Sequence, residues 1–168
     1  KEVAELLIAN GADVNAKDGD GFTPLDMAEI TAGTSPPEFK AGLEETADLL
    51  RKHGGISGAA DSIHVAAAVG NIEAVKQHLA AGADVNAKTD YGWTPLIHAV
   101  DIGNKEMAEL LIAEGADVNV KVDRVVDGST LLHETTSFWG YNKEIAELLI
   151  DNGADVNAKD GGGSTPLD

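Results

Sequence analysis

Histidine and acidic side chains are the groups in this sequence that could do acid–base or metal chemistry. Two of the five histidines, His64 and His133, stand three residues after Asp61 and Thr130, which can cap the start of a helix. A polar side chain at that spacing can hydrogen-bond back to the first turn of the helix. No two histidines have the spacing of zinc ligands. We therefore predict a structural role for both, with metal binding or acid–base work as the alternative.

Two acidic segments, 155–161 and 18–21, could supply oxygen ligands to calcium. A calcium loop needs oxygen ligands at its positions 1, 3 and 5 and a glycine at position 6. Counting from Asp155, the last two of these positions hold Lys159 and Asp160. Since Asp, Asn and Gly are also the usual residues of turns, we predict hairpin turns here and no metal.

Complete catalytic motifs are missing from the sequence. The glycines at 161–163 are not followed by the Lys and the Ser or Thr of a phosphate-binding loop. Ser129 and His133 could approach each other across one helical turn, but no third catalytic member accompanies them. We predict that the chain is not an enzyme and carries no cofactor.

The charge balance limits the possible partners. The 29 acidic and 12 basic residues give a formal charge of −17, which repels nucleic acid and anionic membrane surfaces. The acidity either keeps a repeat-built surface soluble or attracts a basic protein. No apolar run is long enough to span a membrane. The absence of cysteine favours a reducing, cytoplasmic compartment.

The elements that would position these side chains repeat along the chain. The segment Gly-Ala-Asp-Val-Asn occurs at 11–15, 82–86, 115–119 and 153–157, and its second and third copies begin 33 residues apart. Residues 1–26 also return at 143–168, with 22 of 26 positions identical. Such a period indicates stacked units that share a continuous core rather than one globular core.

Residues 94–119 form the clearest unit. Thr94 can cap a helix in which Pro95 takes the first position, and Gly103-Asn104 ends that helix. A second helix with an apolar face is predicted from Lys105 to Glu114, before a polar loop. Neither helix could bury its apolar face alone, so neighbouring units must supply the other wall.

This unit resembles the ankyrin repeat. The matching residues are Gly-x-Thr-Pro-Leu at 21–25, 92–96 and 163–167, each in phase with a copy of Gly-Ala-Asp-Val-Asn. The resemblance covers nearly the whole chain. It implies an all-α, ankyrin-type repeat solenoid, built from stacked helix-turn-helix units with hairpin loops. It also implies that the chain binds other proteins and does no chemistry of its own.

Departures from the repeat pattern divide the chain. Residues 31–42 exceed the pattern by about ten residues, and we predict a loop there because Pro36-Pro37 cannot lie inside a helix. The Asp-Val-Asn hairpin is missing after Gly54. We therefore predict that residues 1–55 end one array, with a half repeat and a degenerate, capping-like repeat. Residues 56–60 form a seam. Residues 61–168 form a second array, with repeats starting near 61, 94 and 130 and a truncated repeat from 165.

Protein binding is the predicted function. In a solenoid the frame repeats, while the surface of the hairpin tips and first helices varies. Aromatic residues and arginine, which are enriched at interface hot spots, occur in these variable places. We predict a concave partner-binding surface that includes Phe22, Tyr91, Trp93, Ile97, Asp101, Arg124, Val126, Glu134, Phe138, Trp139 and Tyr141. Phe138 and Trp139 could instead fill the gap that an insertion makes between two helices.

Two rival interpretations stay open. The chain could be a structural spacer within a longer ankyrin array, with no ligand of its own. It could also be an engineered repeat protein, although its irregular insertions argue against that.

The sequence opens on a second helix without its first and closes on a first helix without its second. A head-to-tail contact between copies is therefore also expected.

Overall fold

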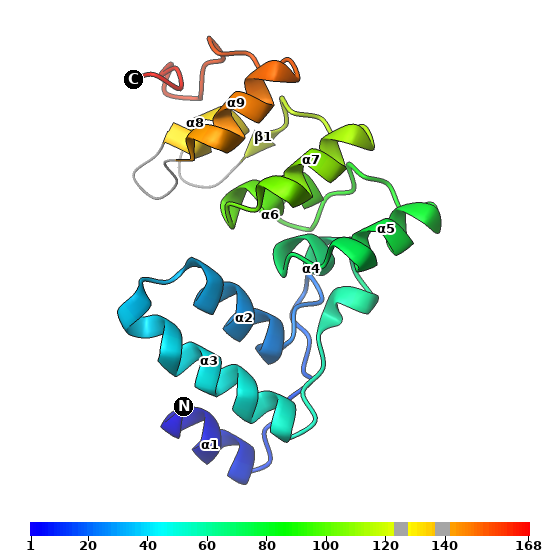
Figure 1. The fold of residues 1–168 in the computed structure, drawn as a ribbon, viewed down its shortest axis with the longest axis vertical. Coiled ribbons are helices and arrows are strands. Elements are labelled where there is room, and N and C mark those ends of the chain that lie inside the picture. Colours follow the sequence, from blue (N-terminus) through cyan, green and yellow to red (C-terminus); the bar gives the residue numbers. More distant parts are fainter. Residues whose placement is uncertain (123–127, 137–141) are drawn as a thin grey trace. The chain divides into compact units, whose positions relative to one another are not determined.

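The computed structural model describes residues 1–122, 128–136 and 142–168, and its main elements are helices (Figure 1). These are α1 (Glu2–Ala9), α2 (Pro24–Thr34), α3 (Pro37–Lys52), the 3-10 turn η1 (Gly58–Ala60), α4 (Ile63–Ala68), α5 (Ile72–Ala80), α6 (Pro95–Asp101), α7 (Lys105–Ala113), α8 (Leu131–Thr136) and α9 (Lys143–Asp151). Strands β1 (Lys121–Val122) and β2 (Ser129–Thr130) pair antiparallel. The predicted all-α repeat architecture is confirmed.

The chain divides into two compact units, Lys1–Val75 and Lys76–Asp168. This boundary lies inside α5 and not at the seam expected over 56–60. Within the first unit, Asn15 of the first hairpin is hydrogen-bonded to both sides of Gly55, through the carbonyl of Gly54 and the N–H of Ile56. The division of the chain into two ankyrin arrays stays a prediction.

Helices α2 and α3 lie side by side in the first unit (Figure 1). Their shared core consists of Leu25, Ala28, Ala47 and Leu50, with Ile8 and Val14 packed against it. The prediction of a loop over residues 31–42 is wrong, since α2 continues to Thr34 and α3 begins at Pro37. Pro36 and Pro37 stand at the N-cap and first position of α3, where a helix needs no N–H donor. The extra residues therefore lengthen two helices.

Side-chain caps set the starts of several helices, as the sequence indicates. Thr23 and Thr94 accept hydrogen bonds from the backbone of the third helical residue of α2 and α6. The cap of α4 is Ser62 and not Asp61, because Asp61 ends the preceding η1 turn. Its carboxylate instead pairs with Lys17 at 2.6 Å. The cap therefore moves by one residue, and the helix begins at Ile63.

In the second unit, each pair of helices buries the same apolar positions. Met107 and Leu111 of α7 are fully buried, as are Ile145 and Leu149 of α9. Leu96 of α6 is equally buried. Since α7 packs with both α6 and α9, the apolar faces form one continuous core through the unit.

Asparagine side chains join consecutive hairpins within the second unit. Asn86 donates to the carbonyl of Gly115 at 3.2 Å and accepts from the N–H of Asp117 at 2.9 Å. Asn119 repeats the pattern one hairpin later, with Gly153 and Asp155. Asn86 and Asn119, each the last residue of a Gly-Ala-Asp-Val-Asn copy, therefore set the spacing between neighbouring hairpins.

Candidate functional site: the hairpin tips

Three hairpin tips share one hydrogen-bonded frame. In each, the first residue donates its backbone N–H to the carbonyl of the residue four positions later, at 2.9–3.0 Å. A glycine with φ between +78° and +90° closes each turn, in a conformation that side chains disfavour. The pairs so joined are Asp18 with Phe22, Thr89 with Trp93, and Asp160 with Ser164. A constant backbone thus presents two variable residues at each tip.

The variable residues of the middle tip are Asp90 and Tyr91. The side chain of Tyr91 is 74% exposed, and Asp90 beside it is also exposed. The other tips carry Gly19-Asp20 and Gly161-Gly162 at the same places. Among these three described tips, the middle one therefore offers a large side chain to a partner.

Trp93 follows this tip and is only half-buried. Its ring lies 5.0 Å from the buried ring of His98, with the two planes inclined at 53°. Trp93 therefore covers the first helix of its own repeat with part of its surface. The rest of the indole stays accessible next to Tyr91 in the sequence.

Burial corrects two of the predicted partner-binding positions. Phe22 is 8% exposed, and Ile97 is 2% exposed. Both side chains belong to the core of their repeats and are not accessible. Sequence variation at these two positions therefore does not indicate a binding surface.

Two of the remaining predicted positions are on first helices. Asp101, the last residue of α6, is exposed, and Glu134 in α8 is half-buried. The other five lie outside the described residues: Arg124, Val126, Phe138, Trp139 and Tyr141.

His133 is held at both ring nitrogens. Its Nδ1 lies 3.1 Å from the backbone nitrogen of Thr130, which can only donate, so Nδ1 is the acceptor. Nε2 then carries the proton and donates to the carbonyl of Ser164 at 3.2 Å. The imidazole thus joins the start of α8 to the following hairpin. This confirms the predicted bond back to the helix start, and Ser129, the other candidate for chemistry, is buried.

The same position holds Asp26 in α2 and Asp168 at the last turn. Asp26 is fully buried and forms a reciprocal capping box with Thr23. Asp168 is exposed and accepts from the backbone N–H of Thr165 at 2.6 Å. That hydrogen bond, together with one from the Thr165 hydroxyl, lowers the pKa of the Asp168 carboxyl. Both aspartates therefore bond back to the threonine three residues before them.

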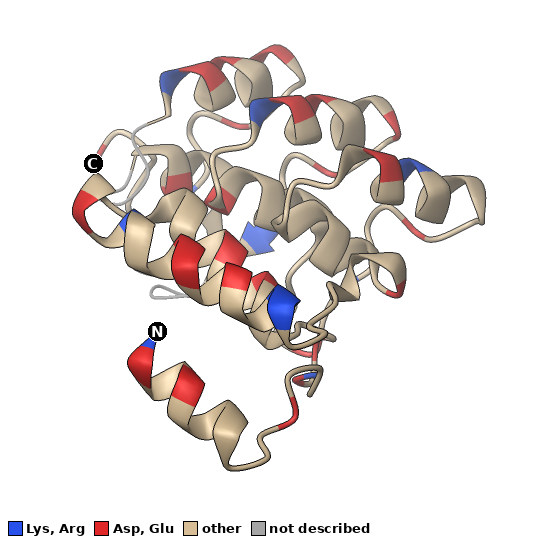
Figure 2. Cartoon of the chain, turned by 60° about the horizontal axis from the view of Figure 1, so that its bottom comes forward, with Lys and Arg blue, Asp and Glu red and all other residues tan. Residues whose placement is uncertain are grey.

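Charge is spread over the surface instead of being gathered at one place. Acidic residues occur on many helices and loops, and the few basic residues lie among them (Figure 2).

Within the described residues, no three His, Asp or Glu side chains come together as a metal site would require. In the same part of the chain, no helix has the length and apolar character needed to cross a bilayer.

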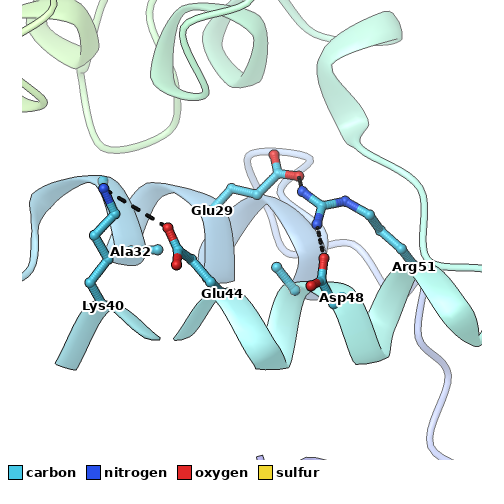
Figure 3. Close-up of a pocket in the computed structure, with 8 residues that line it drawn as sticks. Glu29, Ala32, Lys40, Glu44, Asp48 and Arg51 are labelled. Atoms are coloured by element: carbon cyan, nitrogen blue, oxygen red, sulfur yellow. Dashed lines mark hydrogen bonds and ion pairs between the residues drawn. The ribbon is translucent and has the colours of Figure 1, made fainter. Parts of the chain in front are cut away.

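A groove of about 470 Å³ lies between α2 and α3, and the sequence did not predict it (Figure 3). Arg51 bridges its walls, with N–O distances of 2.7 Å to both Glu29 and Asp48. Lys40 and Glu44 form a longer pair of 3.9 Å. The sequence carried no sign of this groove because part of its lining, Ala32, Gly33 and Lys40, falls in the loop that was expected over residues 31–42. Exposed ion pairs of this kind contribute under about 1 kcal/mol each.

Comparisons with known proteins agree with this architecture. A family model described as ankyrin repeats (3 copies) matches residues 63–160, and a model described as ankyrin repeats (many copies) matches residues 1–28. The chain belongs to the ankyrin repeat family, whose repeats generally mediate interactions between proteins.

One similar protein is the neurogenic locus notch homolog protein 1 of Xenopus laevis. It is 31% identical over 102 residues, which are 55% of this chain and 4% of that protein. The chain thus spans a small fraction of the length of this relative.

Proposed function

We propose that this chain is a non-catalytic protein-binding module that contacts its partner through the hairpin tips and first helices of the unit Lys76–Asp168. The observation that carries the proposal is the exposed ring of Tyr91 on a tip whose backbone is fixed by the Thr89–Trp93 hydrogen bond. A tyrosine on a fixed backbone offers a large amphipathic surface and loses little conformational entropy on binding.

The acidic side chains in the repeat of Tyr91 indicate which kind of partner would fit this surface. Asp90 at the tip and Asp101 at the end of α6 are exposed carboxylates in the same repeat as Tyr91. A partner that carries Lys or Arg beside apolar residues would complement this combination of acid and aromatic surface. The formal charge of −17 would also speed its approach.

Site-specific photo-crosslinking tests the proposal. A photoreactive phenylalanine analogue replaces Tyr91 in one version of the chain. In a matched control it replaces Phe39, which is also an exposed aromatic, 64% accessible, but lies on α3. We expect a protein that is captured from position 91 and not from position 39.

Capture is followed by an affinity measurement with the purified partner. Tyr91→Ala should weaken binding at least about tenfold, as expected for an interface hot spot, while Phe39→Ala should leave it unchanged. Equal capture from both positions, or unchanged affinity of Tyr91→Ala, would instead favour the rival function of a spacer.

Substitutions of Trp93 and Tyr91 should differ in their effect on stability. Because its ring covers His98, Trp93→Ala should lower the free energy of unfolding by about 1–3 kcal/mol. Tyr91→Ala should leave the melting curve unchanged, since its side chain is mostly in solvent. Only Tyr91→Ala can therefore report on binding without a loss of structure.

A further inference from the structure

Aspartate or asparagine followed by glycine is a sequence at which a protein backbone can rearrange. The backbone nitrogen of the glycine can attack the side-chain carbonyl carbon, because glycine has no side chain to hinder the approach and the two atoms are only a few bonds apart. Six such pairs occur in this chain. Asp127 lies outside the described residues, and the other five pairs begin at Asn10, Asp18, Asp20, Asn152 and Asp160.

Three of these pairs, which begin at Asn10, Asp20 and Asn152, are closed to the reaction. The glycine nitrogen must give up its proton before it attacks, so an N–H held in a hydrogen bond reacts only after local opening. In all three closed pairs the glycine donates its N–H to the carbonyl three residues before it, at 3.0–3.2 Å. The side-chain amides of Asn10 and Asn152 are held as well, each by a 2.8 Å hydrogen bond to the carbonyl four residues before.

The other two pairs, Asp18-Gly19 and Asp160-Gly161, are open. Both glycines are exposed at hairpin tips, and in the described part of the chain neither donates its N–H to any group. Each aspartate carboxylate accepts from the backbone N–H groups two and four positions later, at 2.8–3.0 Å. The ring closed by the first of these hydrogen bonds contains the glycine nitrogen, so that nitrogen and the carboxyl carbon are held within one small ring.

The free N–H is a property of the hairpin tip itself. In the middle tip, which has helices of neighbouring repeats on both sides, the corresponding N–H belongs to Asp90 and also donates to no group among the described residues. The residue before it is Thr89, whose hydroxyl accepts from the N–H of Trp93 at 3.2 Å. A hydroxyl carries no carbonyl carbon, so the middle tip keeps the frame without the reaction.

We propose that Asp18 and Asp160 are sites of spontaneous conversion to isoaspartate in the folded chain. The nitrogen of the following glycine forms a bond to the side-chain carboxyl carbon, whose hydroxyl group leaves as water together with the amide proton. The product is a five-membered succinimide. Water then adds to one of its two carbonyls. Addition at the former backbone carbonyl breaks the bond of that carbon to nitrogen and leaves the chain running through the former side chain, while addition at the other carbonyl restores aspartate.

Isomerisation at Asp18 dismantles the frame of its tip. The Asp18 carboxylate holds the N–H groups of Asp20 and Phe22 at 3.0 and 2.9 Å. In isoaspartate the carboxyl carbon becomes part of the main chain, which is one carbon longer, so this arrangement is lost. Phe22 is a core residue, and the loss therefore reaches the interior of its repeat. Tyr91 lies in the tip that lacks the reaction, so the proposal is independent of the partner-binding surface.

Peptide mapping of the folded chain, after weeks in a mildly acidic buffer, tests the proposal. Mass spectrometry with electron-transfer fragmentation distinguishes isoaspartate from aspartate. The same chain unfolded in guanidinium chloride gives the intrinsic rate of each pair, since every glycine N–H is then released from the fold. In the folded chain the rate at the two open pairs should stay within about threefold of the unfolded rate, whereas at the three closed pairs it should fall at least about tenfold.

Asp18→Asn compares the same chemistry at open and closed pairs within one molecule. An amide oxygen can accept the two N–H groups that the carboxylate binds, so the tip should keep its fold, which urea denaturation checks. In neutral buffer the amide at position 18 should be lost at least about tenfold faster than those of Asn10 and Asn152, because only its glycine N–H is free. In guanidinium chloride the three amides should be lost at similar rates. Equal protection of open and closed pairs in the unmodified chain, or equal loss of the three amides in the folded variant, would overturn the proposal.

Discussion

The side-chain oxygen of Asn119 accepts a hydrogen bond of 2.9 Å from the backbone N–H of Asp155 in the next hairpin. The amide group of the same side chain donates to the carbonyl of Gly153 at 3.1 Å. A primary amide carries one acceptor and one donor group, so it can bind one backbone group of each kind. One asparagine therefore satisfies two backbone groups and fixes the spacing of two hairpins.

Asn119→Ala should remove both bonds and lower the free energy of unfolding by about 1–2 kcal/mol. Urea denaturation at low protein concentration measures the loss. Asn157→Ala is the matched control, because no further Gly-Ala-Asp-Val-Asn copy follows it in this sequence. An equal loss in both variants would show that the asparagine acts within its own hairpin and not between hairpins.

Asp26→Asn tests the buried capping residue of α2. The Asp26 carboxylate accepts hydrogen bonds from Thr23 N at 2.8 Å, Ser57 Oγ at 2.5 Å and Gly58 N at 2.9 Å. An amide loses the negative charge and keeps only one of the two accepting oxygens, so we expect a loss of about 2–3 kcal/mol in unfolding free energy.

Thermal and urea unfolding of Asp26→Asn can be compared with Asp168→Asn. Asp168 makes the same capping contacts with Thr165 but is exposed to solvent. Water can therefore replace its lost hydrogen bonds, and the control should change stability little. If the two variants lost the same amount, burial would not be what makes Asp26 important.

Two glycines should respond in opposite directions to substitution by alanine. A Cβ at Gly58 would overlap the carbonyl oxygen of Gly21 and lie 3.3 Å from the Asp26 carboxylate, so Gly58→Ala should destabilise the first unit. A Cβ at Gly42 in α3 would meet nothing within 4 Å. Gly42→Ala should stabilise by about 0.5–1 kcal/mol, the usual gain for an exposed helical position. Melting temperatures of the two variants provide the test, and a higher melting temperature of Gly58→Ala would contradict it.

His64 should make stability depend on pH. Burial lowers the pKa of its imidazole, and the negative charge of Asp20 offsets part of this effect. The folded chain therefore binds the proton less readily than the unfolded chain, whose histidine titrates near 6.5. The free energy of unfolding should decrease as the pH falls through and below about 6.5, and it should level off below the folded pKa.

His64→Gln should reduce this loss of stability on acidification, as measured by urea denaturation between about pH 5 and pH 7.5. His53→Gln, which removes an exposed histidine, is the matched control. A pH dependence that is the same in His64→Gln as in the unmodified chain would contradict the assignment.

Local signals in the sequence predicted the helix boundaries well where one residue decides them. Thr23 and Thr94 cap their helices as expected. Gly115 follows α7 with a φ of +93°, in the left-handed region that ends helices. These positions depend on the chemistry of one residue and its nearest neighbours, which a sequence records directly.

Features that depend on packing were predicted less well. Pro36 and Pro37 excluded a helix interior but were equally compatible with a helix start, and the local sequence did not decide between the two. Phe22 and Ile97 vary among the repeats as surface residues do, yet both are buried. Burial is a property of the neighbouring elements, and residue type alone does not specify it. The exposure of Tyr91 agrees with its predicted place in a binding surface, and only a partner can test that role.

The helical extension of α2 and α3 has a consequence for how this repeat tolerates changes of length. A flexible loop at this place would tolerate insertions of any length, because its residues would be free in the folded chain as well as in the unfolded one. Here the extra residues are helical, and only Ser35-Pro36 separates α2 from α3. Adding about one helical turn to each of α2 and α3, roughly seven residues in total, would leave the same residues facing each other. Insertions or deletions at this site should therefore be tolerated in whole turns and penalised in single residues.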